Sequence, residues 1–150
     1  MPPKTILFLC TGNQARSQMA EATMRRLGGD RYEPVSAGSA PKDRVHPLAV
    51  EVMAERGVDI SGVVPKSAAS FLETPVDLVV TLCDSARQAC PVFPGAPEGI
   101  HWDLEDPAAA GGTREERLAA FRLARDEIER RIERLLAEDT GHTHDHGGTA

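Results

Sequence analysis

Residues 5–21 have the sequence TILFLCTGNQARSQMAE. The apolar run Thr5–Leu9 leads into Cys10, a short glycine-containing loop follows, and small and apolar residues recur at helical spacing beyond Arg16. A buried strand, a short loop and a helix in this order are typical of α/β proteins, in which helices cover a parallel sheet. The segment therefore predicts an α/β fold in which Cys10 lies at the C-terminal end of the first strand.

The rest of the chain continues the alternation of strands and helices. Further strands are predicted over Tyr32–Ala37, Val76–Leu82 and Gly99–Trp102. Helices are predicted over Ser17–Leu27, Pro47–Glu55 and Lys66–Leu72, the last of them short. A final long helix is expected after the capping-box sequence Thr113-Arg-Glu-Glu116. Because apolar strands alternate with helices, we expect one parallel sheet covered on both faces.

Size and composition fit a single domain. The chain has 150 residues, 41% of them hydrophobic and 27% charged, and a formal net charge of -6. This acidic balance argues against nucleic-acid binding, which needs a basic face. No apolar run is long enough to cross a bilayer and no secretory signal is evident, so we expect a cytoplasmic protein. We also expect a monomer. The polar, glycine-rich residues 139–150 are predicted to form a disordered tail behind a domain of residues 1–138.

The sequence contains three cysteines, Cys10, Cys83 and Cys90. An odd number of cysteines in a cytoplasmic chain is a poor basis for a structural disulfide framework and fits catalytic or redox thiols better. The alternative is that all three are small buried apolar residues, as free cysteines often are. Cys10, between an apolar strand and a glycine-containing loop, favours the first interpretation. Cys83 directly follows a core strand and would also pack well as a buried residue, so the alternative stays open for it.

The loop after the first strand is predicted to bind a tetrahedral oxyanion. A strand–loop–helix connection points several backbone N–H groups at one spot, and the helix N-terminus adds about half a positive charge. Arg16 can fork onto two anion oxygens, while Cys10 lies in the same positive field, which favours the nucleophilic thiolate. The competing interpretation is a buried cysteine followed by a solvated arginine. The candidate oxyanion-binding residues are Thr11, Gly12, Asn13, Gln14, Ala15, Arg16 and Ser17.

The sequence CTGNQARSQMAE, residues 10–21, resembles the signature loop of the low-molecular-weight protein tyrosine phosphatases, and more closely that of the thioredoxin-coupled arsenate reductases built on the same fold. The resemblance covers roughly residues 4–136. It implies a four-stranded parallel sheet flanked by helices, with the active site at the C-terminal edge of the sheet. It also implies a general acid in an aspartate–proline pair, which indicates Asp106 before Pro107, with Asp103 as the alternative.

Two further thiols distinguish a reductase from a phosphatase. Cys83 and Cys90 lie seven positions apart in LCDSARQACP. A helix over this segment would separate them by about 10 Å, so a disulfide requires it to melt or loop out. The resemblance implies that Cys10 attacks arsenate, that Cys83 attacks Cys10 as arsenite leaves, and that Cys90 attacks Cys83. Thioredoxin would then reduce the resulting disulfide. The alternatives are a phosphatase that uses Cys10, Arg16 and Asp106, and a non-catalytic oxyanion-binding module.

Other residues bear on the ligand. The sequence DPAAAGG, residues 106–112, has no aromatic side chain to clamp a phosphotyrosine ring, which favours a small oxyanion: arsenate, with phosphate or sulfate as competitors. Asn13, Glu21 and Ser36 match side chains of the potassium site in some arsenate reductases of this type, but Pro65 stands near the expected acidic ligand. We therefore predict no resident metal and no bound cofactor.

The histidines are expected to be structural or solvated. His46 and His101 are isolated in the sequence and are predicted to be surface or packing residues. His142, His144 and His146 alternate along the tail and could bind a metal if the tail were extended, but a solvated tail is the simpler interpretation.

Overall fold

The computed structural model describes residues 2–84, 93 and 98–148, with residues 139–148 described by their backbone alone. The strands are β1 (Lys4–Cys10), β2 (Tyr32–Gly38), β3 (Leu78–Cys83) and β4 (Gly99–Asp103). The helices are α1 (Arg16–Gly28), α2 (Pro47–Ala54) and α3 (Arg114–Gly148), and the short 3-10 segments are η1 (Gly29–Arg31), η2 (Ala68–Phe71) and η3 (Pro107–Ala109). The strands form one parallel sheet in the order β2-β1-β3-β4, which confirms the predicted α/β fold.

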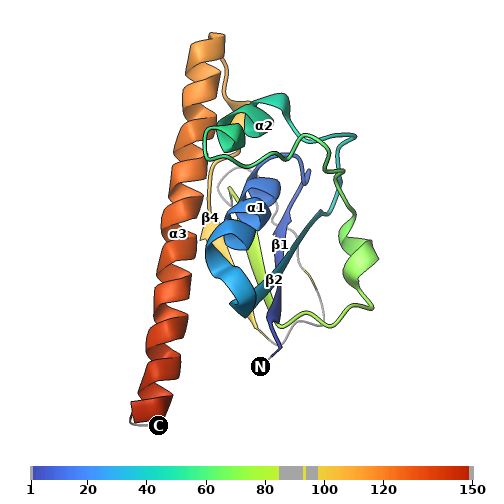
Figure 1. Cartoon of the computed structure of the whole chain (residues 1–150). Coiled ribbons are helices and arrows are strands. Elements are labelled where there is room, and N and C mark those ends of the chain that lie inside the picture. Colours follow the sequence, from blue (N-terminus) through green and yellow to red (C-terminus); the bar gives the residue numbers. More distant parts are fainter. Residues whose placement is uncertain (1, 85–92, 94–97, 149–150) are drawn as a thin grey trace.

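The helices α1, α2 and α3 gather on one side of the sheet (Figure 1). The main hydrophobic core lies between them and one face of the sheet, and it includes Phe8 of β1, Met19 of α1 and Phe121 of α3, all fully buried. Leu7 and Leu9 alternate with Phe8 and point to the opposite face, where a smaller apolar cluster packs against η2. In the described part of the chain, this second face is covered by a 3-10 segment instead of a full helix.

The predicted helix Lys66–Leu72 is therefore a 3-10 segment over Ala68–Phe71. Long-range contacts hold the residues before it in an extended backbone. The Lys66 N–H donates to Asn13 Oδ1 at 2.8 Å, and Ser67 forms an isolated parallel bridge with Gly38. The Ser67 hydroxyl then accepts the Ala69 N–H and caps the short turn.

The strand β3 begins at Leu78, two residues later than the apolar pattern predicts. Asp77 explains the difference, because its carboxylate accepts the Thr5 N–H at 2.8 Å while its own N–H donates to the Thr5 carbonyl at 2.9 Å. The side chain thus replaces a backbone partner at the first position of the ladder. Val76 is buried, but it precedes the strand.

Helix α3 begins at the predicted capping box. The Thr113 N–H donates to Glu116 Oε1 at 2.9 Å, and the Glu116 N–H donates to Thr113 Oγ1 at 3.1 Å. The helix continues to Gly148, past the expected boundary at residue 138, and residues 114–148 contain no proline that would interrupt its backbone hydrogen bonds. None of the helices formed by the described residues is long and apolar enough to cross a membrane.

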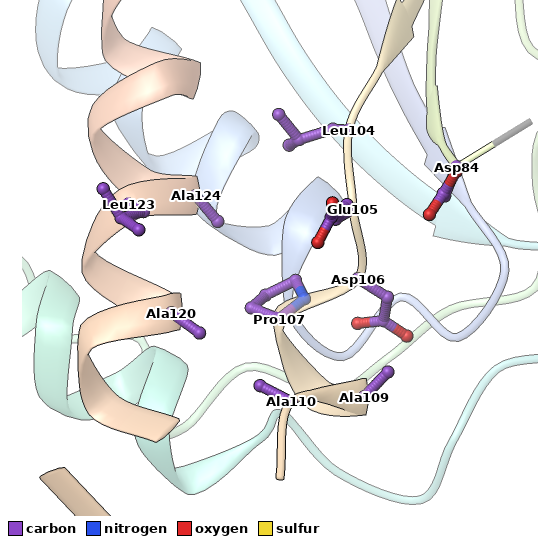
Figure 2. Close-up of a pocket in the computed structure, with 10 residues that line it drawn as sticks. All are labelled: Asp84, Leu104, Glu105, Asp106, Pro107, Ala109, Ala110, Ala120, Leu123 and Ala124. Carbon is purple, nitrogen blue, oxygen red and sulfur yellow. The ribbon is translucent and has the colours of Figure 1, made fainter. Parts of the chain in front are cut away.

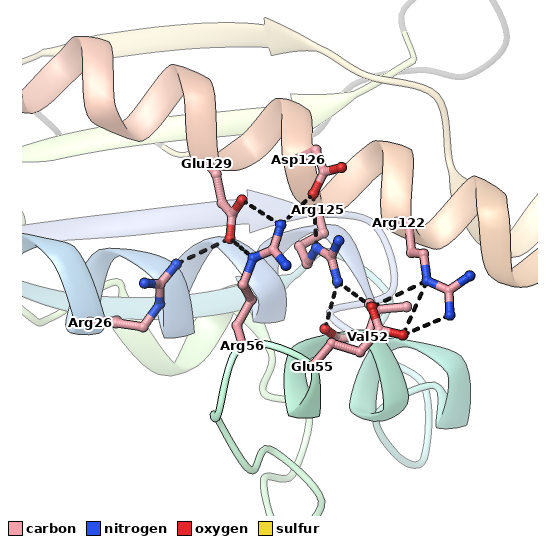
Figure 3. Close-up of polar contacts among 8 residues, drawn as sticks. All are labelled: Arg26, Val52, Glu55, Arg56, Arg122, Arg125, Asp126 and Glu129. Atoms are coloured by element: carbon pink, nitrogen blue, oxygen red, sulfur yellow. Dashed lines mark hydrogen bonds and ion pairs between the residues drawn. The ribbon is translucent and has the colours of Figure 1, made fainter.

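Arginine side chains fasten α3 to α2 and α1 (Figure 3). Arg125, which is buried, donates to the Val52 carbonyl at 2.9 Å and to Glu55 at 2.6 Å. Hydrogen bonds from Arg122 and Arg125 lower the pKa of Glu55 to about 2. Arg26 of α1 and Arg56 after α2 both bind Glu129 of α3, at 3.1 and 2.7 Å. These contacts hold the helical layer over the sheet.

Candidate active site

Four carbonyl groups of the loop between β1 and α1 accept hydrogen bonds from backbone N–H groups of the segment after β2. The donor–acceptor pairs are Ser39–Cys10 at 3.1 Å, and Ala40–Thr11, Lys42–Gly12 and His46–Gln14 at 2.9 Å each. In a trans peptide the N–H points opposite to the preceding carbonyl, so these contacts turn the following N–H groups toward the inside of the loop. No side chain caps the start of α1, which adds its positive end to the same space. This arrangement can hold a tetrahedral oxyanion.

Two backbone positions make the loop possible. Asn13 has a φ of 49°, in the left-handed region that asparagine tolerates better than most residues. Its Oδ1 accepts the Lys66 N–H at 2.8 Å and Gln18 Nε2 at 3.0 Å, which fixes the orientation of the amide. Gly38 lets the end of β2 approach the loop, because a Cβ there would lie 2.5 Å from the Thr11 carbonyl oxygen.

The sulfur of Cys10 is buried and has two polar neighbours. Ser17 Oγ lies 2.9 Å from Sγ, and the Asn13 N–H donates to Sγ at 3.2 Å. Asn13 Nδ2 donates to Ser17 Oγ at 2.7 Å, so the serine hydroxyl can direct its own proton at the sulfur. Two donors aimed at one sulfur stabilise a thiolate, which is the nucleophilic form.

The network of side-chain hydrogen bonds continues from Asn13 to the carboxylate of Glu21. Asn13 Nδ2 also donates to Ser36 Oγ at 3.1 Å, and the Ser36 hydroxyl donates to Glu21 Oε1 at 2.6 Å. Arg25 binds Glu21 at 2.7 Å and the Pro34 carbonyl at 3.0 Å. Glu21 thus supports Asn13 through Ser36. The positive charge beside Glu21 is that of Arg25.

Arg16 joins the loop to the predicted acid. Its guanidinium is buried, donates to the Leu104 carbonyl at 3.0 Å and lies 3.7 Å from Asp106 Oδ2. Asp106 Oδ1 accepts the Ala108 N–H at 3.0 Å and caps η3, so the carboxyl group is held at the mouth of the loop. Asp103, the alternative acid, lies in β4 beside His101 at 3.9 Å. The structure therefore brings Asp106 to Arg16.

A cavity of about 630 Å³ lies beside this acid, between the segment after β4 and helix α3. Asp84, Glu105 and Asp106 line one side of it, and Ala120, Leu123 and Ala124 of α3 contribute the other. In Figure 2, Pro107 faces α3, whereas the Asp106 carboxylate lies on the opposite side of its segment. The cavity extends from the acid to Asp84, which follows Cys83 directly.

The second predicted thiol, Cys83, ends the strand next to β1. The parallel register pairs Leu9 with Thr81, so Cys10 and Cys83 both lie at the C-terminal edge of the sheet. Cys83 is fully buried and disulfide-bonded, whereas Cys10 is free. Cys90 lies outside the described residues, as does the expected conformational change between Cys83 and Cys90.

Sequence reasoning missed several residues that shape the loop. The side chain of Gln18 and the backbone of Lys66 orient Asn13, and the backbone of His46 holds Gln14. Only Arg25 had a local signal, because it follows Glu21 by four positions on a predicted helix. The described residues contain no group of three potential metal ligands, and the side chains of the tail histidines lie outside them.

Residues 5–142 match the family described as low molecular weight phosphotyrosine protein phosphatase. The match spans β1, the loop, the predicted acid and most of α3. This chain belongs to that family. Within the low-molecular-weight phosphatase family, the chain is 47% identical over 132 residues to an arsenate reductase of Halalkalibacterium halodurans, covering 88% of this chain and 94% of that protein. It is 44% identical over 132 residues to an arsenate reductase of Bacillus subtilis, with the same coverage of both chains.

Solved structures of similar proteins agree with this fold. An arsenate reductase in a phosphate-binding state superposes with a TM-score of 0.75 at 33% identity, covering 90% of this chain and 98% of that one. A thioredoxin-dependent arsenate reductase of Corynebacterium glutamicum gives a TM-score of 0.68 at 33% identity, covering 91% of this chain and 62% of that one. The YwlE arginine phosphatase of Geobacillus stearothermophilus shares the fold, with a TM-score of 0.75 at 24% identity.

Proposed function

We propose that this protein reduces arsenate to arsenite through a relay of three thiols, with thioredoxin as the electron donor. The first step takes place in the loop, where inward N–H groups and Arg16 hold the arsenate oxygens. The Cys10 thiolate attacks arsenic, an oxygen departs, and Asp106 supplies its proton so that the product is water. The product of this step is an adduct with a bond between Cys10 Sγ and arsenic(V).

The second step moves two electrons to arsenic. The Cys83 thiolate attacks Cys10 Sγ, a Cys10–Cys83 disulfide forms, and the sulfur–arsenic bond breaks with its electron pair going to arsenic. Arsenic(V) becomes arsenic(III), which leaves as arsenite. Cys90 then attacks Cys83 and releases the Cys10 thiolate. The remaining Cys83–Cys90 disulfide takes two electrons from thioredoxin, which resets the relay.

The observation that carries this proposal is the contrast between Cys10 and Cys83. A phosphatase needs a nucleophile, an arginine and an acid, and it has no use for a disulfide at the end of β3. Cys83 is disulfide-bonded and Cys10 is free. Because the sequence contains only three cysteines, Cys90 is the candidate partner of Cys83 within one chain. The arsenate reductases among the relatives support the same function.

A phosphatase is the second candidate, and the geometry of Arg16 and Asp106 favours it as a side activity. The contact of 3.7 Å between these residues would serve phosphate ester hydrolysis as well as arsenate reduction. Phosphate and arsenate have the same shape and charge, so slow hydrolysis of aryl phosphates is expected even from a reductase. The two functions differ in their need for Cys83 and Cys90.

The test measures arsenate-dependent NADPH oxidation in the presence of thioredoxin and thioredoxin reductase. We expect the unsubstituted protein to turn over and the Cys90→Ser variant to stop after about one equivalent of arsenate, because its disulfide cannot reach thioredoxin. Aryl phosphate hydrolysis by the same variant serves as the control for a folded loop. Multiple turnovers by Cys90→Ser, or no arsenate reduction by the unsubstituted protein beside steady phosphate hydrolysis, would contradict the relay.

A further inference from the structure

His46 lies where three parts of the candidate site meet. Its backbone N–H donates to the Gln14 carbonyl in the oxyanion loop at 2.9 Å. Its ring packs against Phe121 of α3, with 4.7 Å between the ring centroids. Its Nδ1 accepts the Leu48 N–H at 3.1 Å and caps the start of α2. His46 therefore contacts the loop through its backbone, and α2 and α3 through its ring.

The cap determines which nitrogen of the ring carries the proton. An Nδ1 that accepts a backbone N–H must offer a lone pair, so the neutral ring holds its proton on Nε2. A proton on Nδ1 would remove the acceptor. It would also set a positive charge at the positive end of α2, which is unfavourable.

Two charged groups act on the His46 ring from neighbouring elements. Burial has the largest effect on the pKa of His46 and lowers it; Arg117 of α3 lowers it further, and Asp106 of the acid loop acts in the opposite direction. Arg117 forms no ion pair with another residue that the structure describes. The neutral form is thus favoured near pH 7, and protonation is expected only below the ordinary histidine value of 6.5.

Protonation of His46 would reach the loop through the segment after β2. His46 is the last of four residues in this segment whose N–H groups turn loop carbonyls outward, and Lys42 holds Gly12 in the same way at 2.9 Å. If the cap breaks, the start of α2 and the backbone of His46 lose their anchor. The Gln14 carbonyl is then free to turn, and the Ala15 N–H turns with it.

We propose that His46 is a positioning residue: while neutral it holds the oxyanion loop in its binding shape, and when protonated it releases the loop and weakens oxyanion binding. The proposal rests on the proposed function only in taking the loop as the oxyanion site. It predicts that oxyanion affinity falls at acid pH because of a residue outside the loop itself. Cys10 and Asp106 are unchanged in every variant below, so a difference between variants isolates His46.

The experiment measures sulfate affinity by calorimetry from about pH 8 to about pH 5, a range over which sulfate keeps its charge while histidine titrates. In the unsubstituted protein, affinity should be constant near pH 7 and fall about fivefold at the acid end, the size expected for a lost helix cap. His46→Asn should bind sulfate with a flatter profile, because asparagine caps a helix well and does not titrate. His101→Asn, at an exposed histidine, should keep the unsubstituted profile.

Arg117→Gln supplies a second readout. Removing this cation should raise the pKa of His46, so the loss of affinity should begin at a higher pH than in the unsubstituted protein. Identical profiles for the unsubstituted protein and His46→Asn would overturn the proposal, as would nitrogen chemical shifts that place the neutral proton on Nδ1. If none of the variants bound sulfate even at about pH 7.5, the oxyanion loop itself would be refuted, whereas arsenate turnover tests the relay separately.

Discussion

The sulfur atoms of Cys10 and Cys83 lie at the ends of neighbouring strands, yet they are held in different ways. Cys10 is free, with a hydroxyl at 2.9 Å and a backbone N–H at 3.2 Å from its sulfur. Cys83 is disulfide-bonded and packed inside the protein at the end of β3. The sulfur of Cys10 belongs to a buried polar network. The sulfur of Cys83 lies at the start of a segment that carries another thiol, Cys90. In the proposed relay, this difference corresponds to oxyanion binding and attack at Cys10 and to electron transfer at Cys83.

Replacing each sulfur in turn should separate the two roles and give the largest effect. Cys10→Ser should reduce both arsenate reduction and aryl phosphate hydrolysis more than about a thousandfold, because serine at this position lacks a base to activate it. Cys83→Ser should abolish arsenate turnover but keep phosphate hydrolysis within about threefold. The two assays are run on both variants. Equal loss of phosphate hydrolysis would contradict the division of roles.

Asp106, the predicted acid, should affect the reaction at Cys10 and not thiol exchange at Cys83. Asp106→Asn keeps an oxygen to accept the Ala108 N–H, so η3 should remain capped while the proton donor is lost. We expect kcat for phosphate hydrolysis to fall between about a hundredfold and ten-thousandfold. Asp103→Asn is the matched control and should leave kcat nearly unchanged. A larger loss of kcat in Asp103→Asn would indicate that Asp103 of β4 is the acid.

The polar chain behind Cys10 should have a smaller effect. Ser36→Ala removes the hydroxyl that links Asn13 to Glu21, which leaves a buried amide hydrogen without its partner. We expect kcat/KM to fall about tenfold, in line with the cost of an unsatisfied buried group. The activity of Cys83 in thiol exchange should not change. Ser70→Ala, at an exposed position, provides the control. An equal loss of kcat/KM in this variant would contradict a role for the hydrogen bonds of Ser36.

The arginine contacts of Figure 3 join α3 to α2 and α1 and involve neither sulfur, so we expect them to affect stability alone. Glu55→Gln should lower the melting temperature at neutral pH by about 2–4 °C. The folded-state pKa of Glu55 is about 2, below its ordinary value of 4.5, so its stabilisation is complete above about pH 4.5 and disappears as the pH falls toward 2. Thermal melts of both proteins over this range measure the difference. A difference that grows toward acid pH would contradict this assignment.

Local patterns predicted the parts of the molecule that local forces determine. The apolar run before Cys10 and the capping box at Thr113 each depend on neighbours in the sequence, and the structure agrees with both. The choice of Asp106 as the acid came from the resemblance and stays a prediction, because its contact with Arg16 spans 90 positions and could not be read from local patterns.

Features that depend on distant contacts were missed or misplaced. The predicted helix at residues 66–72 is shorter because Lys66 bonds to Asn13, which is far away in the sequence. The start of β3 shifted because Asp77 binds Thr5. His46 looked like an isolated packing residue, since its partner Phe121 lies on another helix. In each case a tertiary contact outweighs local propensity.

The most direct test of the relay is a single turnover of the fully reduced Cys90→Ser variant with one equivalent of arsenate and no other reductant. The relay predicts one arsenite per chain and a Cys10–Cys83 disulfide identified by peptide mapping, because Cys83 has displaced arsenic and no third thiol is present to continue. Arsenite formation without that disulfide, or retention of two free thiols with no arsenite formed, would contradict it.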